Sequence, residues 1–240
     1  MQNPEVLLTA ANASASHLHT LTWNAEHSNA PRKRQRTRAR LLAATARVMA
    51  AKGYVDFRVC DIAAEAWMSN GAFYVYFADR EEAAREVLSG LVRRLYLSDR
   101  NQGQDDDGVR LIARHLEALQ CDAPLVGALC QAVLLDDVLA RLHAGAVGLW
   151  RAHLCAVLLG ASEAHHILKK GPRPDVLDLM IEGMARRAGA PMLTQNGLLR
   201  VAAEVAEAWR ASQAQVAHPA GAQAPSSVLI QPYAPPSRVA

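Results

Sequence analysis

Hydrophobic residues recur with a helical period along most of the chain. The first clear repeat begins near Arg38, where four residues share the i, i+3, i+4, i+7 spacing of one helix face: Leu41, Ala44, Thr45 and Val48. Gly53 follows this repeat, and a glycine can end a helix in the left-handed conformation. The pattern therefore predicts a helix from about Arg38 to Gly53 with one apolar face.

Two shorter helices are predicted next. The segment DIAAEA (61–66) keeps its apolar residues on one face. Ser69 is a good N-cap for the following helix, in which Phe73 and Phe77 lie one turn apart and share a face. A short helix, a three-residue turn and a second short helix form the pattern of a helix-turn-helix.

The rest of the chain also has the pattern of helices. Asp79 and Glu82 have the spacing of a capping box at the start of a helix over about 79–98. After the turn-rich, acidic stretch NQGQDDDG, five more helices are predicted: about 109–121, 123–137, 138–160, 174–188 and 196–212. Strand alternation and internal repeats are absent from the sequence, so we predict an all-α fold.

Both ends of the sequence lack this periodicity. The first 30 residues are rich in Asn, Ala, Ser, Thr and His, and the last 28 hold five of the eleven prolines. We therefore divide the chain into a disordered, basic-ended extension, a helix-turn-helix domain, a helical ligand-binding and dimerisation domain, and a disordered tail: 1–33, 34–94, 95–212 and 213–240.

Composition excludes several classes of protein. No apolar run approaches the roughly 20 residues that a membrane span needs. The N-terminal residues lack the basic and apolar regions of a signal peptide, so we expect a cytoplasmic protein. The four cysteines are far apart and form no CxxC pair. This spacing predicts buried free thiols, with no metal site, disulfide or cofactor.

Charge is concentrated before the predicted helix-turn-helix. Residues 1–60 hold nine Lys and Arg against three Asp and Glu, although the whole chain carries a net charge of only +3. The basic residues crowd into PRKRQRTRARLLAATAR, which includes Arg36 and Arg38. Such a block is either a solvated arm or a surface that binds a phosphate backbone. On the second interpretation, Arg36 and Arg38 are candidate phosphate contacts.

The stretch AWMSNGAFYVYF (66–77) holds five of the twelve aromatic residues. In a helix that begins near Ser69, the two phenylalanines point inward and the two tyrosines, Tyr74 and Tyr76, are forced off that face. An exposed tyrosine can donate to a phosphate oxygen or a base edge. Side chains at Asn70 and Ala72 can also reach base edges, and Gly71 allows a close approach to a groove.

At these residues the sequence resembles the DNA-binding domain of the TetR family of transcriptional regulators, over about residues 34–94. The resemblance is carried by RARLLAATARVMAAKGY, VCDIAAEA and MSNGAFYVYFADREE. The last segment matches the family pattern V-S-x-G-T-F-Y-x-Y-F-x-x-K-E, with Arg80 in place of Lys, at seven positions: Ser69, Gly71, Phe73, Tyr74, Tyr76, Phe77 and Glu81. The resemblance implies base-edge contacts from Asn70, Gly71 and Tyr74. It implies phosphate contacts from Ser69, Tyr76 and Arg80.

Two positions depart from the family pattern. Trp67 stands in the turn where the family has Gly, and a non-Gly residue in the left-handed conformation costs about 1–2 kcal/mol. One outcome is a remodelled turn in which Trp67 packs against the domain. Phe57 and Arg58 replace the usual Thr pair before the second helix, so Asp56 is a candidate substitute cap. Arg58 is either a phosphate contact or a solvated side chain.

The C-terminal helices carry two apolar stripes: Leu177, Met180, Ile181, Met184 and Ala188 on one, and Leu198, Val201, Ala202, Val205 and Trp209 on the other. The resemblance implies that these helices bind an effector and form a homodimer. The alternative is that both stripes pack within their own subunit.

The candidate effector contacts are Trp150 and His153. His153 shares an apolar stripe with Leu142 and Leu149, although a histidine on such a stripe is more often a core residue than a ligand contact. The body has no cluster of basic residues suited to a polyanion. This composition permits an apolar or weakly polar small-molecule effector.

Together, these features predict a ligand-responsive, dimeric transcriptional repressor that binds a palindromic site in double-stranded DNA. The helix over about 79–98 would transmit effector binding to the DNA-binding domain. Two alternatives remain: a non-specific architectural DNA-binding protein, or a regulator with a degenerate reading helix that acts through a protein partner. The sequence has no recognisable Ser/His/Asp or Cys/His set, HExxH motif or phosphate loop, so we expect no enzyme.

Overall fold

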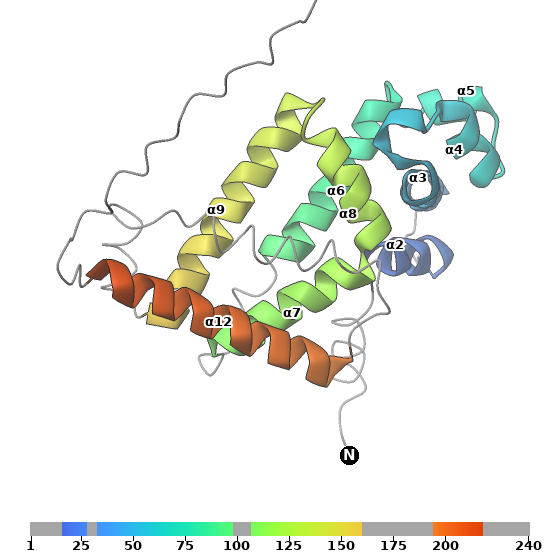
Figure 1. Cartoon of the computed structure of the whole chain (residues 1–240). Helices are drawn as coiled ribbons and strands as arrows, with labels where there is room; N and C mark the ends of the chain where they lie inside the picture. Colours follow the sequence, from blue (N-terminus) through green and yellow to red (C-terminus); the bar gives the residue numbers. More distant parts are fainter. Residues whose placement is uncertain (1–15, 28–32, 98–106, 160–193, 218–240) are drawn as a thin grey trace, which may run out of the picture.

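The computed structural model describes residues 16–27, 33–97, 107–159 and 194–217, with side chains as far as residue 210 (Figure 1). Every regular element in these ranges is a helix: α2 (His17–Glu26), α3 (Lys33–Asp56), α4 (Val59–Glu65), α5 (Asn70–Tyr74), α6 (Arg80–Tyr96), α7 (Gly108–Cys121), α8 (Ala123–Ala132), α9 (Asp137–Leu159) and α12 (Gln195–Ala217). The predicted all-α fold is confirmed. The helix predicted over 174–188 lies outside the described residues.

Helix α3 is kinked at Gly53, near the position where the sequence predicts its end. Gly53 has φ +80° and ψ 177°, a combination that side-chain-bearing residues rarely adopt. The kink turns the next backbone N–H groups toward α8, where Tyr54 N donates to Gln131 Oε1 at 2.7 Å. A Cβ atom on Gly53 would lie 2.7 Å from the same oxygen. Glycine is therefore favoured by the backbone conformation, and any larger residue would also have to displace the Gln131 amide.

The predicted caps are present on α5 and α6. Ser69 Oγ accepts a hydrogen bond from Ala72 N at 3.2 Å. Asp79 Oδ1 accepts from Glu82 N at 2.6 Å. Glu82 Oε2 accepts at 2.6 Å from Ala78 N, one residue before the cap, so the reciprocal bond of a capping box is shifted by one residue. Helix α4 begins without a side-chain cap, because its N-cap residue is Arg58. The structure therefore does not bear out Asp56 as a substitute cap.

A continuous core joins the N-terminal and C-terminal helices. We call residues 33–79 the head and residues 107–210 the body. The head packs around three buried rings, those of Phe57, Phe73 and Phe77. Helix α6 leaves the head and runs alongside α9, and α12 lies across α7 on the far side of the body (Figure 1). Helix α6 therefore connects the head directly to the body.

Residues 16–27 form a packed helix, which corrects the prediction of a disordered extension over 1–33. Helix α2 lies against α3, with Leu18 and Leu21 on the core. His17 N donates to Asp122 Oδ1 at 2.7 Å, and Arg94 Nε lies 3.0 Å from Asp122 Oδ2. Burial lowers the pKa of His17, and its ring contacts the Val87 carbonyl at 3.0 Å. Helix α2 is therefore anchored to α6 and to the α7–α8 corner.

Helix α12 corrects the dimer-interface prediction for one stripe. Leu198, Val205 and Trp209 are buried within the protomer, where α12 packs on α7 and α9. Val201 is half-buried beside them. These side chains pack within their own subunit, so they are not available to a second copy. The other predicted stripe, with Leu177, Met180, Ile181 and Met184, lies outside the described residues, as does the tail beyond Ala217.

Helix α9 is long and apolar enough, by length and composition, to cross a membrane, with a mean hydropathy of 1.4 over 18 residues. This corrects the expectation that no apolar run approaches that length. A core helix of a soluble protein passes the same test. In this fold α9 lies against α6 and buries Leu139, Ala146 and Leu154 in the common core.

The thiols are free, but only Cys155 is buried among the four cysteines. Cys60 and Cys130 are exposed, which corrects the prediction that all four lie in the core. Within the described ranges, no group of three or more His, Cys, Asp or Glu side chains is arranged to hold a metal ion.

Candidate nucleic-acid interface

Helix α5 has one buried face and one exposed face. Phe73 of α5 and Phe77, which follows the end of the helix at Tyr74, point into the core with their ring centroids 5.4 Å apart. On the opposite side Asn70 and Gly71 are exposed and Ala72 is half-buried, and 58% of Tyr74 is exposed. A Cβ atom built on Gly71 would meet nothing within 4 Å, so the protein itself does not require glycine at this position. The arrangement leaves the start of α5 open to a large external partner.

The two tyrosines differ more than the sequence indicates. Tyr74 projects from the surface, whereas Tyr76 is half-buried against the core. The Arg34 guanidinium lies 5.9 Å from the centre of the Tyr76 ring. The expectation that both tyrosines are exposed is therefore corrected. Val75, which the sequence analysis did not single out, lies between them with 63% of its surface exposed.

The turn between α4 and α5 keeps the backbone of a glycine turn although it contains tryptophan. Trp67 has φ +58°, the only positive value for a non-glycine residue in the described part of the chain. Trp67 N donates to the Ala64 carbonyl at 3.0 Å and Met68 N to the Ala63 carbonyl at 2.8 Å. The indole is 89% exposed, so the predicted packing of Trp67 against the domain is wrong. The strain is local, and the turn is not remodelled.

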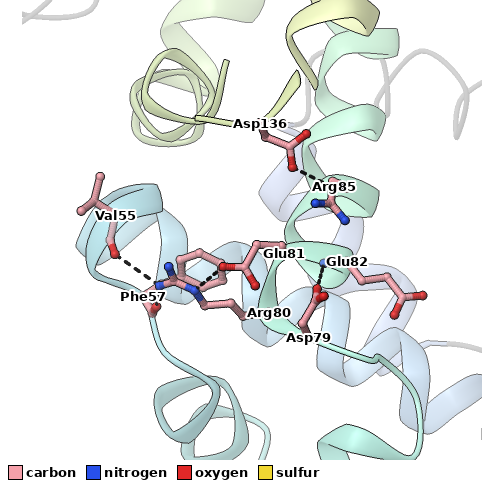
Figure 2. Close-up of polar contacts among 8 residues, drawn as sticks. All are labelled: Val55, Phe57, Asp79, Arg80, Glu81, Glu82, Arg85 and Asp136. Atoms are coloured by element: carbon pink, nitrogen blue, oxygen red, sulfur yellow. Dashed lines mark hydrogen bonds and ion pairs between the residues drawn. The ribbon is translucent and has the colours of Figure 1, made fainter. Parts of the chain in front are cut away.

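Arg80 is held by the protein (Figure 2). Its Nη1 donates to the carbonyls of Val55 and Phe57, at 3.2 and 2.5 Å, and its Nε lies 2.7 Å from Glu81 Oε1. The guanidinium also covers the Phe57 ring at 4.9 Å. These contacts tie the start of α6 to the link between α3 and α4. Arg80 therefore fixes the geometry of the head, and most of its donors are unavailable for the phosphate contact that the sequence predicts.

Arg38 is engaged in a similar way. Its guanidinium forms two hydrogen bonds with the Glu86 carboxylate of α6 and lies 4.8 Å from the centre of the Phe77 ring. The hydrogen bonds from Glu86 raise the pKa of Arg38. A phosphate contact by Arg38 would have to replace this carboxylate.

The remaining predicted basic contacts lie at helix starts. Arg36 is exposed in the first turn of α3, beside the exposed Lys33 and Arg34. Arg58 is exposed at the N-cap of α4. Anions are favoured at helix N-termini, and the first residues of α5 are exposed, whereas the first turn of α4 already contains the Asp61 carboxylate. The candidate interface therefore consists of the exposed start of α5, with basic side chains at the starts of α3 and α4.

The predicted ligand contacts separate in the structure. Trp150 is 2% exposed and stacks on His115 with ring centroids 4.3 Å apart. Tyr96 and His143 complete this group of rings. His153, by contrast, is half-buried with no ring contact to this group. The sequence analysis did not single out Tyr96, His115 and His143, because α6, α7 and α9 bring them together from distant parts of the sequence.

The head matches a known family. Residues 41–87 match the family described as "Bacterial regulatory proteins, tetR family". Uncharacterized HTH-type transcriptional regulators of Mycobacterium tuberculosis and Mycobacterium bovis are 33% identical to the chain over 116 residues. The match covers 47% of this chain and 53% of theirs, so the chain spans about half the length of these relatives.

Solved structures share the fold over a longer stretch. A transcriptional regulator from Rhodococcus sp. Rha1 has a TM-score of 0.58 and 24% identity, covering 71% of this chain and 94% of its own. A transcriptional regulator of the TerR/AcrR family from Aquifex aeolicus has a TM-score of 0.53 and 16% identity, covering 73% and 98%. At this level of identity the likeness concerns the fold, which extends well beyond the head.

Proposed function

We propose that this chain, as a member of the TetR family of transcriptional regulators, is a sequence-specific, dimeric repressor. It would release double-stranded DNA when a small molecule binds its body. The observation that carries the proposal is the division of α5 into two faces. Phe73 and Phe77 fix the helix on the core, while Asn70, Gly71 and Tyr74 remain exposed.

The residues of this face have the chemistry to read DNA. An asparagine amide pairs with adenine in the major groove, and Ala72 can contact a thymine methyl group. Tyr74 supplies a hydroxyl on a rigid ring, and Ser69 lies at the helix N-terminus, where a phosphate is favoured. Arg36 and Arg58 add sequence-independent attraction to the backbone. Tyr76, half-buried beside Arg34, would contribute mainly by positioning that arginine.

A dimer follows from the size of the reading helix. Helix α5 has five residues and spans only about 7.5 Å, which covers few base pairs. Two copies related by a two-fold axis would read two half-sites about 34–36 Å apart, and the operator would be palindromic. Because one α12 stripe is buried within the protomer, the dimer would have to use other surfaces of the body. The stripe at Leu177–Met184 remains our prediction for that interface.

Helix α6 would connect effector binding with DNA release. Arg80 holds the head at the start of α6, and Arg85 pairs with the buried Asp136 of the α8–α9 turn at 2.6 Å (Figure 2). Tyr96 ends the same helix inside the body. An effector that favours a different position of α6 would therefore change the separation of the two heads. The size of the response depends on the difference in effector affinity between the two arrangements.

The direct test is selection of bound duplexes from a random DNA library, followed by fluorescence anisotropy across a salt series. We expect an enriched palindrome whose half-sites lie one helical turn apart. Asn70→Ala should cost about 1–3 kcal/mol on the enriched site and relax the preference at one base pair. Arg36→Gln should weaken binding to all duplexes alike and reduce the salt slope by about one. If no sequence is enriched, the repressor proposal fails.

Two other functions make different predictions in the same experiment. An architectural protein would bind all duplexes with similar affinity and a steep salt dependence. A regulator that acts through a protein partner would not bind DNA, and the exposed Trp67 would be the first candidate for its contact surface. For the repressor, we place the protein in the cytoplasm and assign DNA binding to residues 34–94 and effector binding to residues 95–212.

A further inference from the structure

Trp150 carries a buried hydrogen-bond donor that pairs with no residue in the described part of the chain. Its side chain is 2% exposed, and its Nε1–H meets no acceptor among the residues that the structure describes. Leaving such a donor unpaired costs a protein more than the hydrogen bond would contribute, and most buried polar groups are paired. Among the described residues, the indole N–H is therefore available to an acceptor on a bound molecule.

Three helices bring further rings to this indole. Trp150 of α9 stacks on His115 of α7, with centroids 4.3 Å apart and planes inclined by 29°. Tyr96 of α6 meets Trp150 edge-on at 6.3 Å and lies 5.2 Å from His115. His143, about two turns before Trp150 on the same face of α9, lies 5.4 Å from the Tyr96 ring. We call these four residues the aromatic cluster.

The polar atoms of the aromatic cluster are arranged around uncharged rings. Burial lowers the pKa of His115 to about 4, so this ring is neutral near pH 7. Its Nδ1 contacts the Leu95 carbonyl at 3.0 Å and must carry the proton, which leaves Nε2 as an acceptor. The Tyr96 hydroxyl lies 3.3 Å from His143 Nε2. Trp150 Nε1 is thus the donor of the aromatic cluster for which the described ranges supply no acceptor.

We propose that the aromatic cluster is the effector site of the regulator and that it binds a flat, uncharged aromatic compound whose carbonyl-type oxygen accepts from Trp150 Nε1. The inference rests on the proposed function, because it specifies the ligand of the same regulator. A flat ring suits the stacked and edge-on geometry of the aromatic cluster. The acceptor follows from the unpaired donor. A charged ligand would lose its hydration without gaining a counter-charge from Trp150, Tyr96 or neutral His115.

The position of Tyr96 connects this site with DNA release. Tyr96 is the last residue of α6, and Arg80 is the first. The helix is about 25 Å long, and its far end holds the head through the carbonyls of Val55 and Phe57. A ligand that moves Tyr96 therefore acts on the same rigid element that orients the reading helix.

The test uses two isosteric probes, 2-acetylnaphthalene and 2-isopropenylnaphthalene, which differ in a carbonyl oxygen against a methylene group. They are titrated into the full chain labelled with 15N, and the indole N–H signals of its four tryptophans are followed by NMR. The Trp150 signal is identified by its absence in Trp150→Phe. We expect the ketone to bind about tenfold more tightly than the hydrocarbon and to move the Trp150 signal downfield.

Two variants test whether the indole N–H of Trp150 causes the preference for the ketone. Trp150→Phe keeps an aromatic ring but should lose the tenfold preference for the ketone. Trp209→Phe makes the same truncation at another buried tryptophan, in α12, and should keep it. The comparison of the two probes in the unmodified protein stands even if Trp150→Phe does not fold.

Three results would overturn the proposal: equal affinity for both probes, an unchanged preference in Trp150→Phe, or binding of neither probe. DNA selectivity is measured on the same protein without probes. Selective DNA binding without ketone preference would reject the effector site alone. Ketone preference without selective DNA binding would reject the repressor while leaving a ligand site in the body.

Discussion

Two positions in the head have a positive φ, but the constraints on which residue can occupy them differ. Gly53, at the kink near the end of α3, has φ +80°, and a Cβ atom there would lie 2.7 Å from Gln131 Oε1. Trp67, between α4 and α5, has φ +58° and an indole that is 89% exposed. The first turn is fixed by conformation and packing together. The second is fixed by its hydrogen bonds alone, so it tolerates an unfavourable residue at a local cost.

The largest expected effect is at the packed turn. Gly53→Ala should lower the free energy of unfolding by about 2–4 kcal/mol, because alanine is strained at this φ and its Cβ would displace Gln131. Chemical denaturation measures the change. Gly71→Ala is the matched control, since the space around Gly71 is open, and it should change stability by less than about 1 kcal/mol. Equal losses in both variants would contradict the role assigned to packing.

The contribution of Gln131 can be separated from that of φ. Gln131→Ala removes the acceptor of Tyr54 N and Val55 N, and should cost about 1–2 kcal/mol. In a double-mutant cycle, the cost of Gly53→Ala should fall when Gln131 is already alanine. Fully additive losses would mean that backbone strain alone explains the glycine.

Arg80 holds the link between these turns. Arg80→Met keeps an apolar stem but removes the bonds to the Val55 and Phe57 carbonyls, and should cost about 1–2 kcal/mol of stability at this partly exposed site. Arg80→Lys should recover only part of the lost stability, because one ammonium group cannot reproduce the planar guanidinium or its stacking on Phe57. Thermal unfolding of both variants checks the order. Full recovery with lysine would show that charge alone matters.

The smallest expected effect is a gain at the exposed turn. Trp67→Gly should raise the free energy of unfolding by about 0.5–1 kcal/mol, since relief of the left-handed strain exceeds the extra entropy that glycine adds to the unfolded chain. Trp67→Ala keeps a Cβ atom and should gain nothing. A loss of stability in Trp67→Gly would show that the indole makes a stabilising contact after all.

The features predicted correctly from sequence are those set by nearby residues. The Ser69 cap, the Asp79–Glu82 capping box and the inward phenylalanines depend on spacings of three or four residues. The Gly53 kink likewise follows from one residue type. Local spacing was therefore enough to locate the helix-turn-helix and the exposed face of α5.

The features that were missed depend on partners far away in the sequence. Arg38 pairs with Glu86, 48 positions later, so a basic residue of the arm became a contact within the protein. The aromatic cluster combines residues from three helices. The apolar stripe that contains Trp209 has the same sequence pattern whether it packs within the subunit or against a second copy. Only the position of α7 shows that it packs within the subunit. Period alone does not identify the partner of an apolar face.

The anchoring of α2 has a consequence for the order in which the chain folds. His17 N bonds to Asp122, a separation of 105 residues, so this contact cannot form until α6, α7 and the α7–α8 corner exist. At a synthesis rate of about 5–20 residues per second, Asp122 follows His17 out of the ribosome by roughly 5–20 s. Helix α2 can pack on the neighbouring α3 earlier, but its anchor to the α7–α8 corner forms late, and until then α2 is held by α3 alone.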